Sequence, residues 1–425
     1  MKKSVIMNTT ILCLSIMLAT SCVNQSGEQE YKDTYNRRQF FEIDYEEILE
    51  RKALANLSDI ASSVEYVALE TQNECLVKSV VQYRFTEDFI FVANVDHVLM
   101  FDRKGGFIRK IGKPGRGPGE IGGIRYLSVL EKERQVVVQT NWARKLYYFS
   151  FEGEFLYSAE SPDVENIKVL SNGNQLIYNS PTRGTEKYLF VLKDSSGDTL
   201  SVVYNHYLWE NRSRFSSMVY YHLYTPFYDY KDLTSMKYIY SDTVYLNSGD
   251  SIVPEYIINM GRYKLKDKDR AESLQGDFRI YLEVSKGYRF AVPFEARGKL
   301  FISSMDFFSD IKEEIQWNMI FDRRSGSGNL IVNNQGEPGL ITNNIDGGPD
   351  FWPKGSINDS VVYMPLLSHT LIGEENMNHY IDKEAIDAEK KRDFLKLAGT
   401  TNENSNPVLM IVKLRQESVA GMPVK

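Results

Sequence analysis

The sequence predicts an all-β protein, a six-bladed β-propeller with an inserted helix in the last blade. Three observations point to this fold class. A motif of strand, glycine turn and strand recurs at nearly regular spacing, six runs of apolar residues precede such turns, and strand-like segments lie near both ends of the chain. Units of about 45 residues with four short strands are typical of propeller blades, which hide their edges by closing into a ring.

The recurring motif places a glycine at a tight turn between two strands. Gly105 lies in Phe-Asp-Arg-Lys-Gly-Gly-Phe, and Gly153 follows 48 residues later in Phe-Ser-Phe-Glu-Gly-Glu-Phe. Further copies come at Gly197 and Gly249, offset by 44 and 52 residues, and a more distant one at Gly326. Because glycine adopts the positive φ of a tight hairpin without strain, the recurrence predicts the same turn in successive blades.

Alternating apolar runs ahead of the turns predict the inner strands of the blades. There are six of them, so six blades are expected. The runs are 89–93, 135–139, 175–178, 237–240, 299–302 and 360–364.

The ends of the chain favour a closed ring. Val64–Leu69 and Val408–Leu414 both have strand character, so one can complete the blade that the other begins. Ile381–Leu397 combines a few apolar residues with many charges and predicts the amphipathic helix inserted in the last blade. Ile43–Leu54 predicts a second helix outside the ring.

The composition supports strands and excludes one class of partner. The 27 Tyr and 22 Phe favour pleated, half-buried surfaces. The formal net charge is −7, and removal of Lys2 and Lys3 with a leader changes it to −9. A chain of this charge without a basic stripe is not expected to bind nucleic acid.

The amino terminus has the pattern of a bacterial lipoprotein signal. Two lysines, an apolar stretch and small residues ahead of Cys22 predict a signal peptide over residues 1–21, with Cys22 as the lipidated residue. The alternative is an ordinary signal peptide with a coincidental cysteine. Polar residues over 22–42 predict a flexible tether, which leaves 43–418 for the propeller.

Lipidation at Cys22 would tether the protein to a membrane without a transmembrane helix. Val23 and Asn24 follow the cysteine, so the aspartate that would suggest retention in the inner membrane is missing. The outer membrane is therefore the expected location, facing either the periplasm or the cell surface.

Several segments resemble one family. They are 64–71, 111–120, 345–353 and 406–410, and together they are similar to the six-bladed β-propeller lipoproteins of Bacteroidetes-type bacteria. The Gly/Pro segment behind Phe-Asp-x-Lys-Gly also resembles an NHL repeat. The resemblance implies a propeller in the cell envelope, and it implies no catalytic residue because the family has no established reaction.

The Gly/Pro segment 112–120 is the first candidate for chemistry. It does not match a phosphate-binding loop, because Pro114 follows Gly112-Lys113 and no Ser or Thr stands at the required place. The plainer interpretation is a rigid turn between blades, near one mouth of a central channel. The alternative is that Arg116 or Glu120 contacts a ligand there.

A second candidate is the segment 343–352, which gathers side-chain oxygens, glycines and an aromatic ring. Asp346 and Asp350 could bind a ligand, with Trp352 as a stacking platform for a sugar. The spacing differs from an EF-hand loop, so no metal or cofactor is predicted, although a structural calcium ion stays an alternative. The plainest interpretation is a structural loop.

The function expected from these features is a non-enzymatic binding module of the cell envelope for a glycan, a peptide or a partner protein. Three enzyme motifs are missing: H-E-x-x-H, G-x-S-x-G and C-x-x-C. The alternative is a hydrolase or lyase with its site at the channel mouth, because propellers can assemble an active site from different blades.

Overall fold

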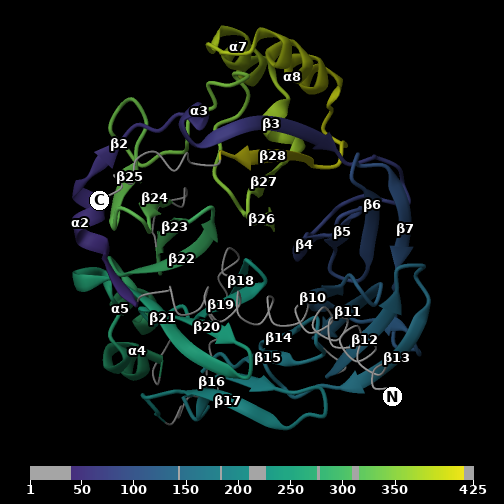
Figure 1. The fold of residues 1–425 in the computed structure, drawn as a ribbon, viewed down its shortest axis with the longest axis vertical. Helices are drawn as coiled ribbons and strands as arrows, with labels where there is room; N and C mark the ends of the chain where they lie inside the picture. The colour runs from purple at the N-terminus through teal and green to yellow at the C-terminus, as the bar shows by residue number, and fades with distance from the viewer. Residues whose placement is uncertain are drawn as a thin grey trace, which may run out of the picture. The chain divides into compact units, whose positions relative to one another are not determined.

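The computed structural model describes residues 40–141, 144–181, 184–209, 226–274, 278–308 and 315–415, without the side chains of 272–274 and 278. Six small sheets surround a common axis and form a six-bladed β-propeller (Figure 1), as the sequence predicts. The predicted signal peptide, Cys22 and the tether up to residue 39 lie outside the described residues.

The first three blades follow the chain without interruption. Each is a four-stranded antiparallel sheet, and its first strand lies nearest the axis (Figure 1). Blade 1 contains β4 (Gln82–Phe85), β5 (Phe89–Ala93), β6 (Val98–Asp102) and β7 (Phe107–Ile111). Blade 2 contains β10 (Ile124–Leu130), β11 (Gln135–Thr140), β12 (Lys145–Ser150) and β13 (Phe155–Glu160). Blade 3 contains β14 (Asn166–Val169), β15 (Gln175–Tyr178), β16 (Tyr188–Lys193) and β17 (Thr199–Tyr204).

Blades 4 and 5 each gain a fifth strand from the amino-terminal segment, at the outer edge of the sheet. Blade 4 contains β18 (Phe227–Tyr230), β19 (Leu233–Lys237), β20 (Thr243–Ser248), β21 (Ser251–Asn259) and the added β1 (Phe41–Asp44). Blade 5 contains β22 (Arg289–Ala296), β23 (Lys299–Asp306), β24 (Trp317–Asp322), β25 (Ser327–Ile331) and the added β2 (Lys52–Ala53). Between these blades lie η1 (Gly261–Tyr263), α4 (Asp267–Leu274) and α5 (Phe278–Ser285).

Blade 6 is assembled from both ends of the chain and closes the ring. It contains β26 (Gly355–Asn358), β27 (Val361–Leu366), β28 (Val408–Leu414) and, as its outer strand, β3 (Ala61–Ala68). The register between β28 and β3 runs from Val408 opposite Ala68 to Leu414 opposite Ala61. This confirms the closure expected from the two terminal strand-like segments.

The five predicted glycine turns join the third and fourth strands of blades 1 to 5. Their φ angles are 91° at Gly105, 87° at Gly153, 95° at Gly197, 64° at Gly249 and 66° at Gly326. A residue with a Cβ is strained at such angles, which explains why glycine recurs there. Blade 6 lacks this turn because its third and fourth strands come from opposite ends of the chain.

The predicted inner strands are the second strands of the blades, one position out from the axis. Five of the six runs coincide with or lie largely within β5, β11, β15, β23 and β27. The run 237–240 is wrong, because β19 ends at Lys237 and the chain turns between Tyr238 and Ser241. Buried Thr234, Ser235 and Lys237 give β19 a polar sequence, and this hid the strand.

The helical insertion in the last blade is confirmed, but the bounds of both predicted helices need correction. The segment expected as one helix forms α7 (Glu374–Asp382) and α8 (Ala388–Thr400), preceded by α6 (Ser368–Leu371), all between β27 and β28. A new helix begins after Asp387 because its carboxylate accepts hydrogen bonds from Glu389 N and Lys390 N. The segment 43–54 contains only α2 (Tyr45–Glu50), flanked by β1 and β2, and α3 (Leu57–Ile60) follows.

Side chains of one blade cap the open inner edge of the next. Gln82 Oε1 accepts from Leu127 N at 2.7 Å, and Arg84 Nε donates to Leu127 O at 3.1 Å. Gln139 Oε1 accepts from Ile167 N at 2.7 Å in the same way. These bonds satisfy backbone groups that a strand next to the axis would otherwise leave without a partner.

Candidate functional site

Charged side chains from three blades come together near the axis of the ring. They are Arg84 on β4, Lys168 on β14 and Asp229 on β18, all on innermost strands. Asp229 Oδ1 accepts from Lys168 Nζ and, at 2.7 Å, from the Thr234 hydroxyl. Arg84 donates to the Tyr126 hydroxyl at 2.8 Å and interacts electrostatically with Asp229. We call Arg84, Lys168 and Asp229 the axis cluster.

Solvent reaches the axis cluster at its acidic member. The side chain of Asp229 is 52% exposed, whereas that of Lys168 is only 12% exposed. Burial by the surrounding strands acts to raise the pKa of Asp229, but Lys168 and Arg84 outweigh it and lower the pKa. Asp229 is therefore ionised at neutral pH, and it presents a carboxylate whose partners hold it in place.

Lys354 adds a further cation directly before β26, another innermost strand. The residue as a whole is exposed. The protein around its ammonium group nevertheless desolvates the charge, and this lowers the pKa of Lys354. Within the described part of the chain no ion pair is formed by Lys354. The axis cluster and Lys354 thus comprise one carboxylate and three cations, an arrangement that suits polar ligands with hydroxyl or acidic groups.

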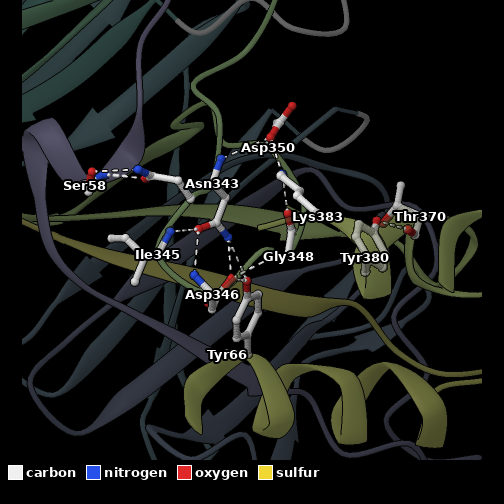
Figure 2. Close-up of polar contacts among 11 residues, drawn as sticks. Ser58, Tyr66, Asn343, Ile345, Asp346, Gly348, Asp350, Thr370, Tyr380 and Lys383 are labelled. Carbon is white, nitrogen blue, oxygen red and sulfur yellow. Dashed lines mark hydrogen bonds and ion pairs between the residues drawn. The ribbon is translucent and has the colours of Figure 1, made fainter. Parts of the chain in front are cut away.

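The predicted loop 343–352 is held by its own hydrogen bonds rather than open to a ligand (Figure 2). Asp346 is 1% exposed. Its Oδ1 accepts from Asn343 Nδ2 at 2.6 Å, from Gly348 N at 2.8 Å and from the Tyr66 hydroxyl at 3.1 Å. A Cβ at Gly348 would lie 2.4 Å from that hydroxyl, so the close approach requires glycine.

The second oxygen of Asp346 is unusual. Oδ2 is buried and has no hydrogen-bond partner among the described residues. Burial raises the pKa of Asp346, and the hydrogen bonds to Oδ1 offset this only in part. Because the carboxyl is shielded from solvent, it cannot reach a substrate at the surface.

Asp350 connects the loop to the helical insertion of blade 6. Lys383 Nζ, just beyond α7, donates to Asp350 Oδ1 at 2.6 Å and to Gly348 O at 2.8 Å (Figure 2). Asp350 Oδ1 also accepts from Asn343 N at 3.1 Å. The Asp350 side chain is 41% exposed, so only part of this carboxylate is open to solvent.

Trp352 belongs to the core. It is 2% exposed, its indole N–H donates to Ser303 Oγ at 2.7 Å, and its ring packs edge-on against Phe301 at 5.7 Å. The ring therefore presents no face on which a sugar could stack, and the expectation of a stacking platform is corrected. Packing between blades 5 and 6 explains the aromatic residue at this position.

The Gly/Pro segment 112–120 forms a rigid turn between β7 and β10. It contains the short parallel pair β8 (Lys113–Pro114) and β9 (Glu120–Ile121). Glu120 accepts from Gly117 N at 2.7 Å and lies 3.2 Å from Lys113 Nζ, so its carboxylate holds the turn together. Arg116 is exposed on the same turn.

The structure does not bring the predicted site residues into one place. Arg116 and Glu120 lie between blades 1 and 2, whereas Asp346, Asp350 and Trp352 lie between blades 5 and 6. The axis cluster escaped sequence reasoning because its residues are far apart in the chain and stand in short, ordinary strands. Ring closure alone brings them together.

The described residues contain no group of three or more His, Cys, Asp or Glu side chains placed to hold a metal ion. None of the helices in the described ranges is long and apolar enough to cross a membrane.

Comparison with known proteins places the chain in a family. Residues 40–413 match the family described as "Domain of unknown function (DUF4934)". The chain belongs to the DUF4934 family. The matched range covers all six blades, including both strands that close the ring, so the family domain is the propeller itself. A comparison with curated proteins finds no significant match.

Two solved structures from Bacteroides are similar to this DUF4934 chain. One is a Bacteroides fragilis protein named as a putative exported protein, with 19% identity and a TM-score of 0.62 over 89% of this chain and 99% of the other. The other is a member of the DUF4221 family from Bacteroides vulgatus, with 11% identity and a TM-score of 0.47 over 84% and 97%. At this identity the first likeness supports the shared fold and nothing further.

Proposed function

We propose that this DUF4934 protein is a binding module of the cell envelope, which holds a glycan, a peptide or a partner protein at the centre of its ring. The observation that carries the proposal is the axis cluster. Asp229 offers an ionised, half-exposed carboxylate that Lys168 and Thr234 hold in position. A preorganised polar group on a rigid scaffold binds a ligand without the entropic cost of ordering the site.

Among these three kinds of ligand, the chemistry of the axis cluster favours the end of a glycan chain. The carboxylate of Asp229 accepts hydrogen bonds from sugar hydroxyls, and the cations of Arg84, Lys168 and Lys354 attract acidic substituents such as uronic acids. Three cations against one carboxylate favour an acidic glycan over a neutral one.

The proposal also includes the location of the protein in the cell envelope. Cys22 carries the lipid that anchors the chain in the outer membrane, and the segment that follows it links the anchor to the propeller. The Bacteroides fragilis protein of similar fold is named as a putative exported protein, and an envelope location for this chain agrees with that name. The sequence around Cys22 supports the anchor itself.

A glycan array with the purified protein tests the binding function, and titration calorimetry then measures the affinity of each hit. Asp229→Asn keeps the size of the side chain but removes the charge that accepts sugar hydroxyls, so affinity for a glycan hit should fall at least about tenfold, a loss of about 1.4 kcal/mol. Asp250→Asn is the matched control, because Asp250 lies on the exposed β20–β21 turn. Equal binding by both variants would contradict a site at the axis.

Fractionation of cells tests the anchor. The wild-type chain should pellet with outer membranes, and Cys22→Ala should move it to the soluble fraction because the lipid is lost. Retention of Cys22→Ala in the membrane fraction would contradict lipidation at this residue, whatever the ligand proves to be.

A further inference from the structure

The outer strand of blade 2 is unusually exposed. In β13 (Phe155–Glu160) three consecutive large apolar side chains face solvent, with Phe155 38%, Leu156 41% and Tyr157 50% exposed. Every residue of the strand except Ala159 is exposed. Phe155 packs against Phe149 on one face of blade 2, and Tyr157 stacks on Tyr148 on the other face, so exposed apolar surface lies on both sides of this edge. Such surface indicates an interaction site.

The backbone edge of β13 is also open. The sheet order of blade 2 ends with β13, and no other strand of the described ranges pairs with its outer side. Blades 4 and 5 differ because β1 and β2 add to their outer edges. The molecule therefore uses strand addition at the same position of two other blades, and blade 2 has the equivalent edge vacant.

The outer strands of blades 1 and 3 are tied to the blade that follows. On β7, Arg109 donates to Glu152 O at 2.7 Å, and on β17, Ser201 Oγ accepts from Ile252 N at 3.0 Å. The one ion pair of β13 in the described residues joins Glu160 to Lys145 of its own blade, at 3.8 Å. Among these three outer strands, β13 thus has the least cover.

β13 lacks two of the features that usually prevent edge pairing, a lysine and a proline. Phe155–Ala159 contains no charge and no proline, and the strand carries its single charge at the last residue, Glu160. Natural edge strands are commonly guarded by lysine, proline or a bulge, and β13 has only the last, since Leu156 is an extra residue between Phe155 and Tyr157 in the pairing with β12. The edge is therefore open, and it is free of charge from Phe155 to Ala159, so a partner strand can add to it.

The charges beside this edge are complementary to those of a second copy of the same chain. In a two-fold antiparallel pairing centred between Tyr157 and Ser158, Phe155 of one copy lies opposite Glu160 of the other. A Cβ on Gly119 would lie 2.8 Å from Phe155 Cβ, so the Gly/Pro turn with exposed Arg116 packs beside the start of β13. Glu160 of each copy would thus approach Arg116 of the other, and no like charges meet within the paired strands.

We propose that the β13 edge is the contact of a homodimer, in which two blades join across a two-fold axis into one continuous sheet. Strand addition supplies main-chain hydrogen bonds, and Leu156 and Tyr157 supply apolar contact. A six-residue strand with one flanking turn is small beside a standard interface, so the dimer is weak in dilute solution. Attachment of both copies to one membrane would strengthen it by raising their effective concentration.

Sedimentation of the full chain over a concentration series tests the dimer. Wild type should pass from monomer to dimer as concentration rises. Arg116→Glu alone brings two acidic side chains together across the interface, and Glu160→Arg alone brings two basic ones together, so each should weaken the dimer by roughly tenfold or more. The double variant R116E/E160R restores opposite charges and should regain most of the affinity.

Leu156→Lys provides a second disruption that does not depend on the charge pair, since it places a charge on the apolar edge. Leu200→Lys on β17 is its control, because Leu200 is also an exposed apolar residue, 38% exposed, on an outer strand. A chain that remains monomeric at every concentration would overturn the proposal. So would a dimer that neither single charge reversal nor Leu156→Lys weakens, since it must use another surface.

Discussion

Met410 in β28 pairs with Tyr66 in β3, although 344 positions separate residues 66 and 410 in the sequence. The pair lies in the middle of the contact that closes the ring. Met410 is fully buried and lies in a cluster with Trp352 and Phe394. Blade 6 therefore joins the two ends of the propeller through packing as well as through backbone hydrogen bonds.

Met410→Ala should lower the free energy of unfolding by about 3 kcal/mol, the range found when a large buried side chain is truncated and leaves a cavity. Thermal or denaturant unfolding followed by circular dichroism measures the change. Val95→Ala is the control, since Val95 is 48% exposed and truncation there should cost within about 0.5 kcal/mol. Equal effects would contradict a tightly packed closure.

Gln139→Ala tests the side-chain caps on the inner strands. Gln139 is 3% exposed, accepts from Ile167 N at 2.7 Å and donates to Val164 O at 3.3 Å. Its loss leaves a buried backbone N–H without a partner and should destabilise the fold by about 1–3 kcal/mol. Gln335→Ala, on an exposed turn, should leave the denaturation midpoint unchanged.

Trp352→Phe separates a core role from a ligand role. The variant loses the hydrogen bond to Ser303 Oγ and part of the ring volume, so the free energy of unfolding should fall by about 1–3 kcal/mol. Affinity for any glycan hit should not change, because the indole is buried. A variant that kept wild-type stability but lost binding would restore Trp352 as a ligand contact.

Asp346→Asn makes a prediction about pH. The raised pKa of Asp346 in the folded state means that the protein favours the neutral carboxyl, so this group stabilises the fold fully only below its unfolded pKa of about 3.9. The contribution is lost as pH rises through the folded pKa, where the ionised carboxylate with its unpartnered Oδ2 becomes a cost. Lys383 is the cation whose charge lowers this pKa and limits that cost.

Asn cannot ionise, so the stability of Asp346→Asn relative to wild type should increase with pH between about 3.9 and the folded pKa, and level off above it. Unfolding free energies measured at several pH values give this difference directly. A difference that stays constant with pH would mean that Asp346 titrates normally. Asp350→Asn is the comparison, since Asp350 is 41% exposed.

The candidate site could be predicted only in part. Sequence reasoning found the loop around Asp346 and the turn around Glu120, because clustered glycines and carboxylates stand out locally. In both places the carboxylate proved to hold its own loop: Glu120 accepts from Gly117 N, and Asp346 accepts from Gly348 N. A local pattern cannot distinguish a carboxylate that binds a ligand from one that binds its own backbone.

The sequence by itself determined the fold class. The requirement for positive φ at Gly105, Gly153 and the three later turns is local, and so is the apolar character of the second strands, so both leave a repeating signature. Strand-like ends likewise predicted how the ring closes. These features depend on residues close together in the chain, and sequence reasoning can read them.

Only the tertiary structure decided which polar groups meet and which edges stay open. Arg84, Lys168 and Asp229 become neighbours because three innermost strands converge on one axis, a relation that spans 145 positions between residues 84 and 229. Whether an outer strand is covered depends on where the amino-terminal segment runs, and from residue 40 onward its strands β1 and β2 pair with blades 4 and 5 and not with β13. Contacts between distant parts of the chain decide which charged groups meet and which outer strands are covered. A local sequence pattern therefore cannot predict either.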